Sequence, residues 1–353
     1  MGGRRSRERN EAAMGLRALL TVTLLMSGCS GSAGSPPAGA EASQPPASAS
    51  TISPTATVVQ PTGSATILPA IGQAADDGAR VIAVTKVDAR TRDLTIDSPA
   101  VGTVEVRLLI PDGFEAQSGA RWPALYLLHG STGSHLDWTQ ETDVAKLTTS
   151  TKLLVVMPDA GDQGWYSDWW NGGHGGPPMW ETFHTRELPV LIERNWHASD
   201  RRVVAGLSMG GYGAVEYAAR RPGMFLAAAS YSGVLDPIGG ELDVDSDVWG
   251  NPVAQKDVWG AHDPVSLASA LKGTALYVSY GDGTAGPLDS GAAVDPGDPE
   301  SWIRDRNETF LKRLTELKIP VTVDAYGPGT HTWPYWERAL HRSLPLLLKA
   351  LGQ

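Results

Sequence analysis

A serine flanked by glycines lies where a strand-like run meets a helix-like run. The segment Gly206-Leu-Ser208-Met-Gly210 follows an apolar run that ends at Ala205. Glycines remove the side chains that would clash in such a sharp turn, and the helix that follows directs its positive N-terminus at the serine hydroxyl. The pattern predicts that Ser208 is a nucleophile.

A serine hydroxyl needs a base to accept its proton and an acid to orient that base. Three histidines follow Ser208, namely His262, His331 and His341. His331 lies in a glycine-rich segment after the last predicted strand, where the base is expected when the chain order is serine, acid, histidine. His262 comes too early and His341 lies within a predicted helix, so we predict that His331 is the base.

The acid should follow the strand-like run that ends near Tyr280. The spacing leaves five carboxylates open: Asp282, Asp289, Asp295, Asp298 and Glu300.

Two backbone amides should stabilise the oxyanion of an acyl-transfer reaction. One is the amide of Met209, next to the serine, and the other lies in the segment after Leu128, where Ser131 has the expected position. His129 in the same segment is predicted either to contact substrate or to pack the loop.

Strand-like and helix-like runs alternate from residue 81 onward, which predicts an α/β fold with a mostly parallel, eight-stranded sheet and helices on both faces. The runs at 81–85 and 104–110 alternate with period two and are expected to form an opening antiparallel pair. Helices are predicted at 180–193, 212–220, 302–317 and 333–351, and long loops at 160–180, 240–262 and 281–300.

Composition excludes several classes of protein. The 353 residues carry 29 Lys and Arg against 39 Asp and Glu, a net charge of -10, so nucleic-acid binding is not expected. Cys29 is the one cysteine, which excludes an intrachain disulfide and a thiolate-rich metal site; we expect no metal and no cofactor. The 12 Trp against 4 Phe predict a wide groove lined by indole rings.

The N-terminal segment has the features of an export signal. Arginines precede an apolar run at 18–26, and Ser27-Gly28-Cys29 resembles a bacterial lipobox, in which Cys29 is lipidated. The alternative is an ordinary signal peptide with an incidental cysteine. Residues 1–28 are thus predicted to be a signal peptide, 29–76 a disordered Ser-, Pro-, Ala- and Gly-rich tether and 77–353 a catalytic domain, lipid-anchored at the outer face of the cell membrane or secreted.

Several segments together resemble one known family, the esterases that include the antigen 85 mycolyltransferases and S-formylglutathione hydrolase, which share the α/β-hydrolase fold. The similar segments, which cover roughly residues 85–350, are Leu127-Leu-x-Gly130, Val156-Met-Pro158, Trp165-Tyr-Ser-Asp-Trp169, Trp180-Glu-Thr-Phe183, Gly206-Leu-Ser-Met209, Ser232-Gly233, Leu235-Asp-Pro237 and Gly329-Thr-His-Thr-Trp-Pro-Tyr-Trp336.

The resemblance implies Ser208 as nucleophile, His331 as base and the Ser131 and Met209 amides as oxyanion donors. In this family the acid is a glutamate shortly before an asparagine and a phenylalanine. Counting back from their counterparts, Asn307 and Phe310, indicates Glu300, with Asp282 as the alternative.

Contacts with substrate are also implied, with one departure. Mycolyltransferases contact their sugar acceptor through an aspartate and an arginine, and His129 and Thr132 stand at those places here, which puts transfer to trehalose in doubt. His129, Asp168, Trp169 and Trp333 are the predicted substrate-binding residues.

The sequence therefore predicts a serine-dependent hydrolase or acyltransferase that acts on carboxylic esters through an acyl-enzyme. Its partners would be an ester or acyl-lipid substrate, a sugar acceptor and, through Cys29, a membrane. The alternative is a non-catalytic module of the same fold that binds a cell-envelope glycolipid or glycan.

Overall fold

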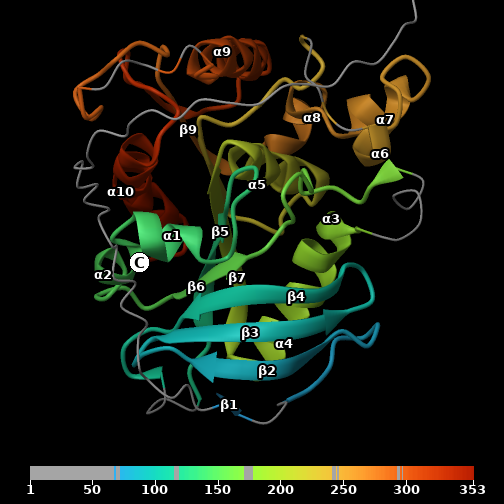
Figure 1. Cartoon of the computed structure of the whole chain (residues 1–353), viewed down its shortest axis with the longest axis vertical. Coiled ribbons are helices and arrows are strands. Elements are labelled where there is room, and N and C mark those ends of the chain that lie inside the picture. The colour runs from blue at the N-terminus through green and yellow to red at the C-terminus, as the bar shows by residue number, and fades with distance from the viewer. Residues whose placement is uncertain are drawn as a thin grey trace, which may run out of the picture. The chain divides into compact units, whose positions relative to one another are not determined.

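The computed structural model describes residues 67–68, 72–114, 119–170, 178–240, 244, 246–291, 295 and 297–353. The predicted signal peptide, most of the tether and Cys29 lie outside these residues. The described part of the chain forms an α/β fold in which one mixed sheet carries helices on both faces (Figure 1).

Nine strands of four or more residues and the two-residue β1 form the sheet, in the order β1-β2-β3-β4-β6-β5-β7-β8-β9-β10. Strands β1 to β4 and β6 pair antiparallel, and β6, β5, β7, β8, β9 and β10 pair parallel. In chain order, from β1 to β10, the strands span Ile67–Leu68, Arg80–Lys86, Thr91–Ser98, Gly102–Leu109, Trp122–Leu128, Leu154–Pro158, Ala198–Leu207, Ala227–Tyr231, Ala275–Tyr280 and Thr322–Ala325.

The prediction of eight strands with an opening pair is wrong at the N-terminal edge. Strand β3 (Thr91–Ser98) lies between β2 and β4 and pairs with both of them. Its Leu94 and Ile96 are fully buried while the positions between them are partly exposed, so it is a half-buried strand with polar outward residues. The alternation of Leu94 and Ile96 with polar residues was the signal in the sequence that indicates this strand.

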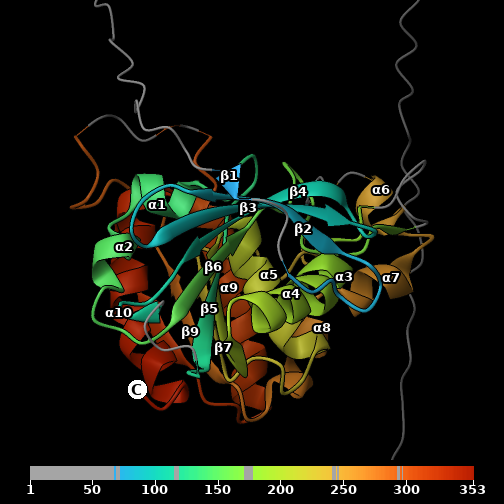
Figure 2. The same ribbon diagram turned by 90° about the horizontal axis from the view of Figure 1, so that it is seen from below.

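The central strands bury alternate residues against opposite layers of helices. On β5, Leu125 and Leu127 pack into the cluster that includes Leu340 and Leu347 of α10 (Trp333–Ala350). The intervening Tyr126 packs into the cluster formed with α5 (Met209–Arg220). Figure 2 shows α1 (Asp137–Glu141), α2 (Val144–Leu147) and α10 on one side of the strands. It shows α3 (Trp180–Thr182), α4 (Leu188–Asn195) and α5 on the other side.

Three of the four predicted helices are continuous, and the fourth is not. Helices α5, α9 (Glu300–Glu316) and α10 correspond to three of the predicted segments. The segment 180–193 is divided into α3, a π-helical turn (Phe183–Glu187) and α4. Segment 240–262, predicted as a loop, contains α6 and α7. The remaining helical segments are α1 Asp137–Glu141, α2 Val144–Leu147, α3 Trp180–Thr182, α4 Leu188–Asn195, α6 Ser246–Trp249, α7 Lys256–Ala261, α8 Pro264–Leu267 and the 3-10 turn Ala268–Leu271.

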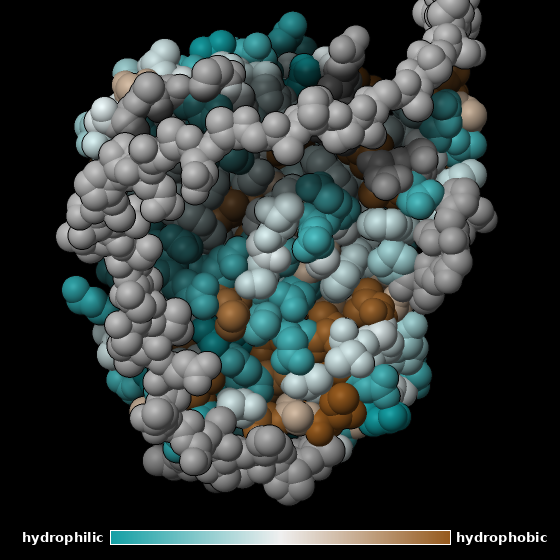
Figure 3. All heavy atoms as spheres, in the orientation of Figure 1, coloured by the Kyte–Doolittle hydropathy of each residue, from teal (hydrophilic) through white to brown (hydrophobic). Residues whose placement is uncertain are grey.

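Hydrophobic groups on the face drawn in Figure 3 lie in small patches between hydrophilic ones. Large hydrophobic side chains that are exposed, such as Val87 and Val253, come from separate elements. Within the described ranges, no helix combines the length and the apolar character needed to cross a bilayer.

Candidate active site

Ser208 occupies a strained turn between β7 and α5. Its backbone has a φ of 51° and a ψ of -120°, which is costly for a residue with a Cβ and is typical of functional turns. The Ser208 amide donates to Tyr231 O at 2.9 Å, which ties the turn to β8. The side chain lines a pocket at the N-terminus of α5, and the strand, turn and helix around it follow the order that the glycine pattern predicts.

The flanking glycines are required by close backbone approach. A Cβ on Gly206 would lie 2.3 Å from Gly210 O, and a Cβ on Gly210 would lie 2.4 Å from Leu128 O. These neighbours are main-chain atoms that cannot move aside, so the turn and the segment after β5 pack in contact only because both positions are glycine.

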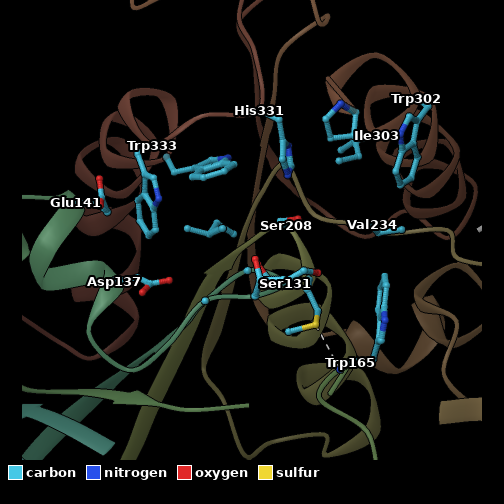
Figure 4. A pocket seen from close by; sticks show the side chains of 17 residues that line it. Ser131, Asp137, Glu141, Trp165, Ser208, Val234, Trp302, Ile303, His331 and Trp333 are labelled. Carbon is cyan, nitrogen blue, oxygen red and sulfur yellow. Dashed lines mark hydrogen bonds between the residues drawn. The ribbon is translucent and has the colours of Figure 1, made fainter. Parts of the chain in front are cut away.

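His331 and Glu300 form a close pair beside the same pocket. His331 Nδ1 lies 2.7 Å from Glu300 Oε2, and because a carboxylate only accepts, Nδ1–H is the donor. This tautomer leaves Nε2 free to accept a proton. Figure 4 shows the His331 ring directed into the pocket toward Ser208, and the Trp336 ring packs edge-on against the imidazole at 4.8 Å.

Glu300 is fully buried at the first position of α9. A buried carboxylate must be compensated by donors. Its Oε1 accepts from Ser232 Oγ and from the Gly281 amide, both at 2.7 Å. With His331 on the other oxygen, the carboxylate is held in one orientation by three segments of the chain.

The other four candidate acids contact neighbouring loop groups instead. Asp282 accepts from Thr284, and Asp295 accepts from the Gly297 amide. Asp289 accepts from Thr330 Oγ1 and Tyr335 OH, and Asp298 accepts the amides of Glu300 and His331. Among the described carboxylates, Glu300 is therefore the one that contacts the His331 ring.

Asp289 shows how tightly this loop holds the segment around His331. Burial raises the pKa of Asp289, but the hydrogen bonds from Thr330, Gly286 and Tyr335 outweigh that effect and keep the pKa below its ordinary value. The carboxylate thus stays ionised beside Thr330, the residue that precedes His331.

The amides of Ser131 and Met209 are the predicted oxyanion donors. Both residues line the pocket beside Ser208. The Thr132 amide, by contrast, donates to Asp162 O at 2.8 Å. Within the described residues neither the Ser131 nor the Met209 amide donates to a backbone carbonyl, so both are available to a bound group.

Three of the predicted substrate contacts lie away from the pocket, whereas Trp333 lines it. His129 is buried, and its Nδ1–H donates to Gly130 O while its Nε2 accepts from the Ala160 amide. Burial lowers its pKa, so the ring is neutral and packs the loop. Asp168 accepts from the Thr182 amide and hydroxyl, and the Trp169 indole donates to Gly164 O.

The pocket has a volume of about 560 Å³ and two walls of different character. Figure 4 shows Trp165, Val234, Trp302 and Ile303 on one side, and Asp137, Glu141 and Trp333 on the other. None of the described residues that line it is Lys or Arg. The tryptophan count predicted such a groove. Asp137 and Glu141 of α1 were not predicted to line it, although their spacing of four residues indicates that they share one face of a helix.

Two groups of acidic residues and histidine lie outside the pocket. His341 Nε2 pairs with Asp143 at 2.7 Å on the surface, close to Glu337. Glu181, Glu216 and His262 are buried, and Arg220 and Arg221 pair with Glu181. Burial, with the charge of Arg220, lowers the pKa of His262 to about 3. The guanidinium groups compensate the buried carboxylates and would repel a metal cation.

The mostly parallel sheet, the serine turn and the histidine–carboxylate pair define an α/β-hydrolase fold, and comparison with solved structures agrees. An S-formylglutathione hydrolase from Agrobacterium tumefaciens superposes with a TM-score of 0.63 over 81% of this chain and 99% of that chain, at 17% identity.

Residues 101–347 match the family model named Esterase, so the chain belongs to the esterase family. The chain is 31% identical over 284 residues to Esterase Rv1288 of Mycobacterium tuberculosis (strain ATCC 25618 / H37Rv), a match that covers 71% of this chain and 58% of that relative. It is also 31% identical over 283 residues to diacylglycerol acyltransferase/mycolyltransferase Ag85A of the same strain, over 73% of this chain and 81% of that protein. Its relatives thus include both esterases and acyltransferases.

Proposed function

We propose that this protein is a serine-dependent carboxylic ester hydrolase or acyltransferase that acts through an acyl-enzyme on Ser208. The observation that carries the proposal is that His331, paired with the buried Glu300, lines the same pocket as Ser208, Ser131 and Met209.

In the first half-reaction, Ser208 Oγ attacks the ester carbonyl carbon while His331 Nε2 accepts the hydroxyl proton. The carbonyl oxygen becomes an oxyanion and accepts hydrogen bonds from the Ser131 and Met209 amides. Collapse of the tetrahedral intermediate breaks the bond to the alcohol oxygen, which takes the proton from His331. The alcohol leaves and the acyl group stays on Ser208.

In the second half-reaction, water or an acceptor hydroxyl gives its proton to His331 Nε2 and attacks the carbonyl carbon of the acyl-enzyme. Collapse of this second tetrahedral intermediate breaks the bond between the acyl carbon and Ser208 Oγ, which takes the proton back from His331, and the acid or the new ester leaves. Glu300 keeps the imidazole in the required tautomer and stabilises the imidazolium in both halves. Hydrolysis and transfer differ only in the nucleophile of this step, so the walls of the pocket decide between them by admitting water or by holding an alcohol.

Burst kinetics test the proposal. The purified protein and Ser208→Ala are mixed with p-nitrophenyl acetate, butyrate and a long-chain ester, with and without sugar acceptors. A burst that depends on Ser208 supports the acyl-enzyme, and faster turnover with formation of a sugar ester supports transfer. An absence of burst and turnover on every ester would refute the enzyme and favour a non-catalytic module.

We also propose, from the sequence features around Cys29, that the protein is exported and anchored by a lipid on that residue. Metabolic labelling with a fatty-acid analogue tests this. Label in the wild type that disappears in Cys29→Ser supports the anchor, whereas unlabelled, released protein indicates an ordinary signal peptide.

A further inference from the structure

Asp298 contacts both partners of the Glu300–His331 pair through the main chain. It lies two residues before Glu300, in the loop that leads into α9. Its Oδ1 accepts the Glu300 amide at 2.9 Å, and its Oδ2 accepts the His331 amide at 3.0 Å. The two amides belong to segments that are 31 residues apart in the chain.

This bridge fixes the main chain on both sides of the side-chain hydrogen bond. The His331 ring reaches Glu300 Oε2 at 2.7 Å, so its geometry depends on where the two Cα atoms lie. A carboxylate can accept from two separate donors at once, and charge-assisted bonds of this kind are stronger than neutral ones. Asp298 therefore closes a ring of contacts that runs through Glu300 and His331.

Asp298 does not line the pocket, so it has no direct contact with a bound substrate there. Its neighbours in the loop behave differently. Asp282 accepts only from the amide and hydroxyl of Thr284, and Asp289 holds Thr330 and Tyr335 without reaching the His331 amide. Among the described carboxylates of the loop, Asp298 alone bonds to the main chain of both Glu300 and His331.

We propose that Asp298 is a positioning residue that sets the distance between Glu300 and His331 and thereby the rate of the proton transfers through His331 in acylation and deacylation. The proposal rests on the proposed function. Its effect is on proton transfer rather than on binding, because a displacement of the imidazole by a fraction of an ångström misaligns Nε2 with the Ser208 hydroxyl, whereas the tryptophan side chains of the pocket stay in place.

The test compares Asp298→Asn with the matched control Asp282→Asn. An asparagine oxygen can accept one of the two amides, but its NH2 group would face the other N–H, so the bridge opens on one side. We expect kcat to fall by roughly 10²-fold, with KM changed by less than about twofold. Asp282→Asn, which loses a contact inside its own turn, should keep both constants.

Rates are expressed per folded molecule, with the folded fraction of each variant taken from circular dichroism, so that an unfolded fraction does not count. A second variant, Asp298→Ser, removes the charge with a smaller side chain and should lower kcat in the same way. The proton on His331 Nδ1, followed by NMR at low field, should broaden or shift in both Asp298 variants and not in the control.

The possible failures are distinguishable. A wild type that is inactive on all esters refutes the proposed function itself. An active wild type with kcat unchanged in Asp298→Asn refutes the positioning role, as does a KM effect without a kcat effect. If neither Asp298 variant folds, the carboxylate stabilises the fold rather than the pair, and the inference is likewise overturned.

Discussion

Replacing Glu300 by glutamine should remove most of the catalytic activity without removing the fold. The reason lies in the donors around the carboxylate. The Gly281 amide, 2.7 Å from Oε1, can only donate, so the glutamine oxygen must take that position. The glutamine NH2 group then faces His331 Nδ1. Two donors cannot share one hydrogen bond, so Nδ1 has to become the acceptor.

The imidazole proton consequently moves to Nε2, the atom that must accept the proton of Ser208. The wrong tautomer of the base costs about 10⁴-fold in kcat in the serine-protease triad, which corresponds to about 5.5 kcal/mol. We expect a loss of the same order here. KM should change little, because Glu300 is fully buried and is not part of the pocket lining.

The assay is steady-state hydrolysis of p-nitrophenyl butyrate by wild type, Glu300→Gln and Asp282→Asn, with circular dichroism to confirm that each variant is folded. Asp282 is the alternative acid from the sequence, and its carboxylate contacts Thr284 instead of His331. A folded Glu300→Gln enzyme with less than a tenfold loss in kcat would refute the tautomer argument. A large loss in Asp282→Asn would show that the wrong carboxylate has been assigned.

Three further predictions concern charge, titration and packing. Glu141 lines a pocket that has no Lys or Arg among its described residues, so its charge should favour cationic esters. In Glu141→Gln, the ratio of kcat/KM for a cationic ester to kcat/KM for an anionic ester of the same size should fall by about fivefold at low salt. Burial raises the pKa of Glu187 from 4.5 to about 7, so its native form keeps a proton that the unfolded chain loses, and stability falls as the pH rises through that window. Glu187→Gln should accordingly raise Tm relative to wild type at pH 8 and not at pH 4.5. An equal change in Tm at both pH values would show that the raised pKa of Glu187 is not the cause. Gly210→Ala should lower kcat by roughly 10²-fold, because the new Cβ would lie 2.4 Å from Leu128 O and would displace the segment that carries Ser131. The control Gly260→Ala, whose new Cβ has no atom within 4 Å, should leave kcat unchanged.

The parts of the site that are local in sequence could be predicted from it. The strand, turn and helix around Ser208 occupy consecutive residues, and glycine spacing reports directly on the backbone approach that the turn requires. His331 follows β10 and precedes α10, and chain order alone places it there. The same locality explains why the buried central strands were found, since unbroken apolar runs are hard to accommodate elsewhere.

The parts that depend on tertiary placement could not be predicted. Strand β3 depends on tertiary placement only in part: the alternation of Leu94 and Ile96 with polar residues was an available signal, and the pairing with β2 and β4 shows that both side chains are buried. His129 was a candidate for substrate contact because it lies next to the oxyanion segment. Only the packing of Ala160 and Gly130 around it shows that both ring nitrogens are already used.

The choice of acid illustrates the same limit and suggests a way past it. Spacing offered five carboxylates in one loop, and burial selects one of them, because a carboxylate can be buried only where donors from other segments converge. Glu300 meets Ser232, Gly281 and His331, which come from three different loops. Asp298, two residues earlier, then bonds to the main chain of the acid and of the base. In this chain the contacts of Glu300 and Asp298 with His331 therefore single out one carboxylate, which distance from the preceding strand does not.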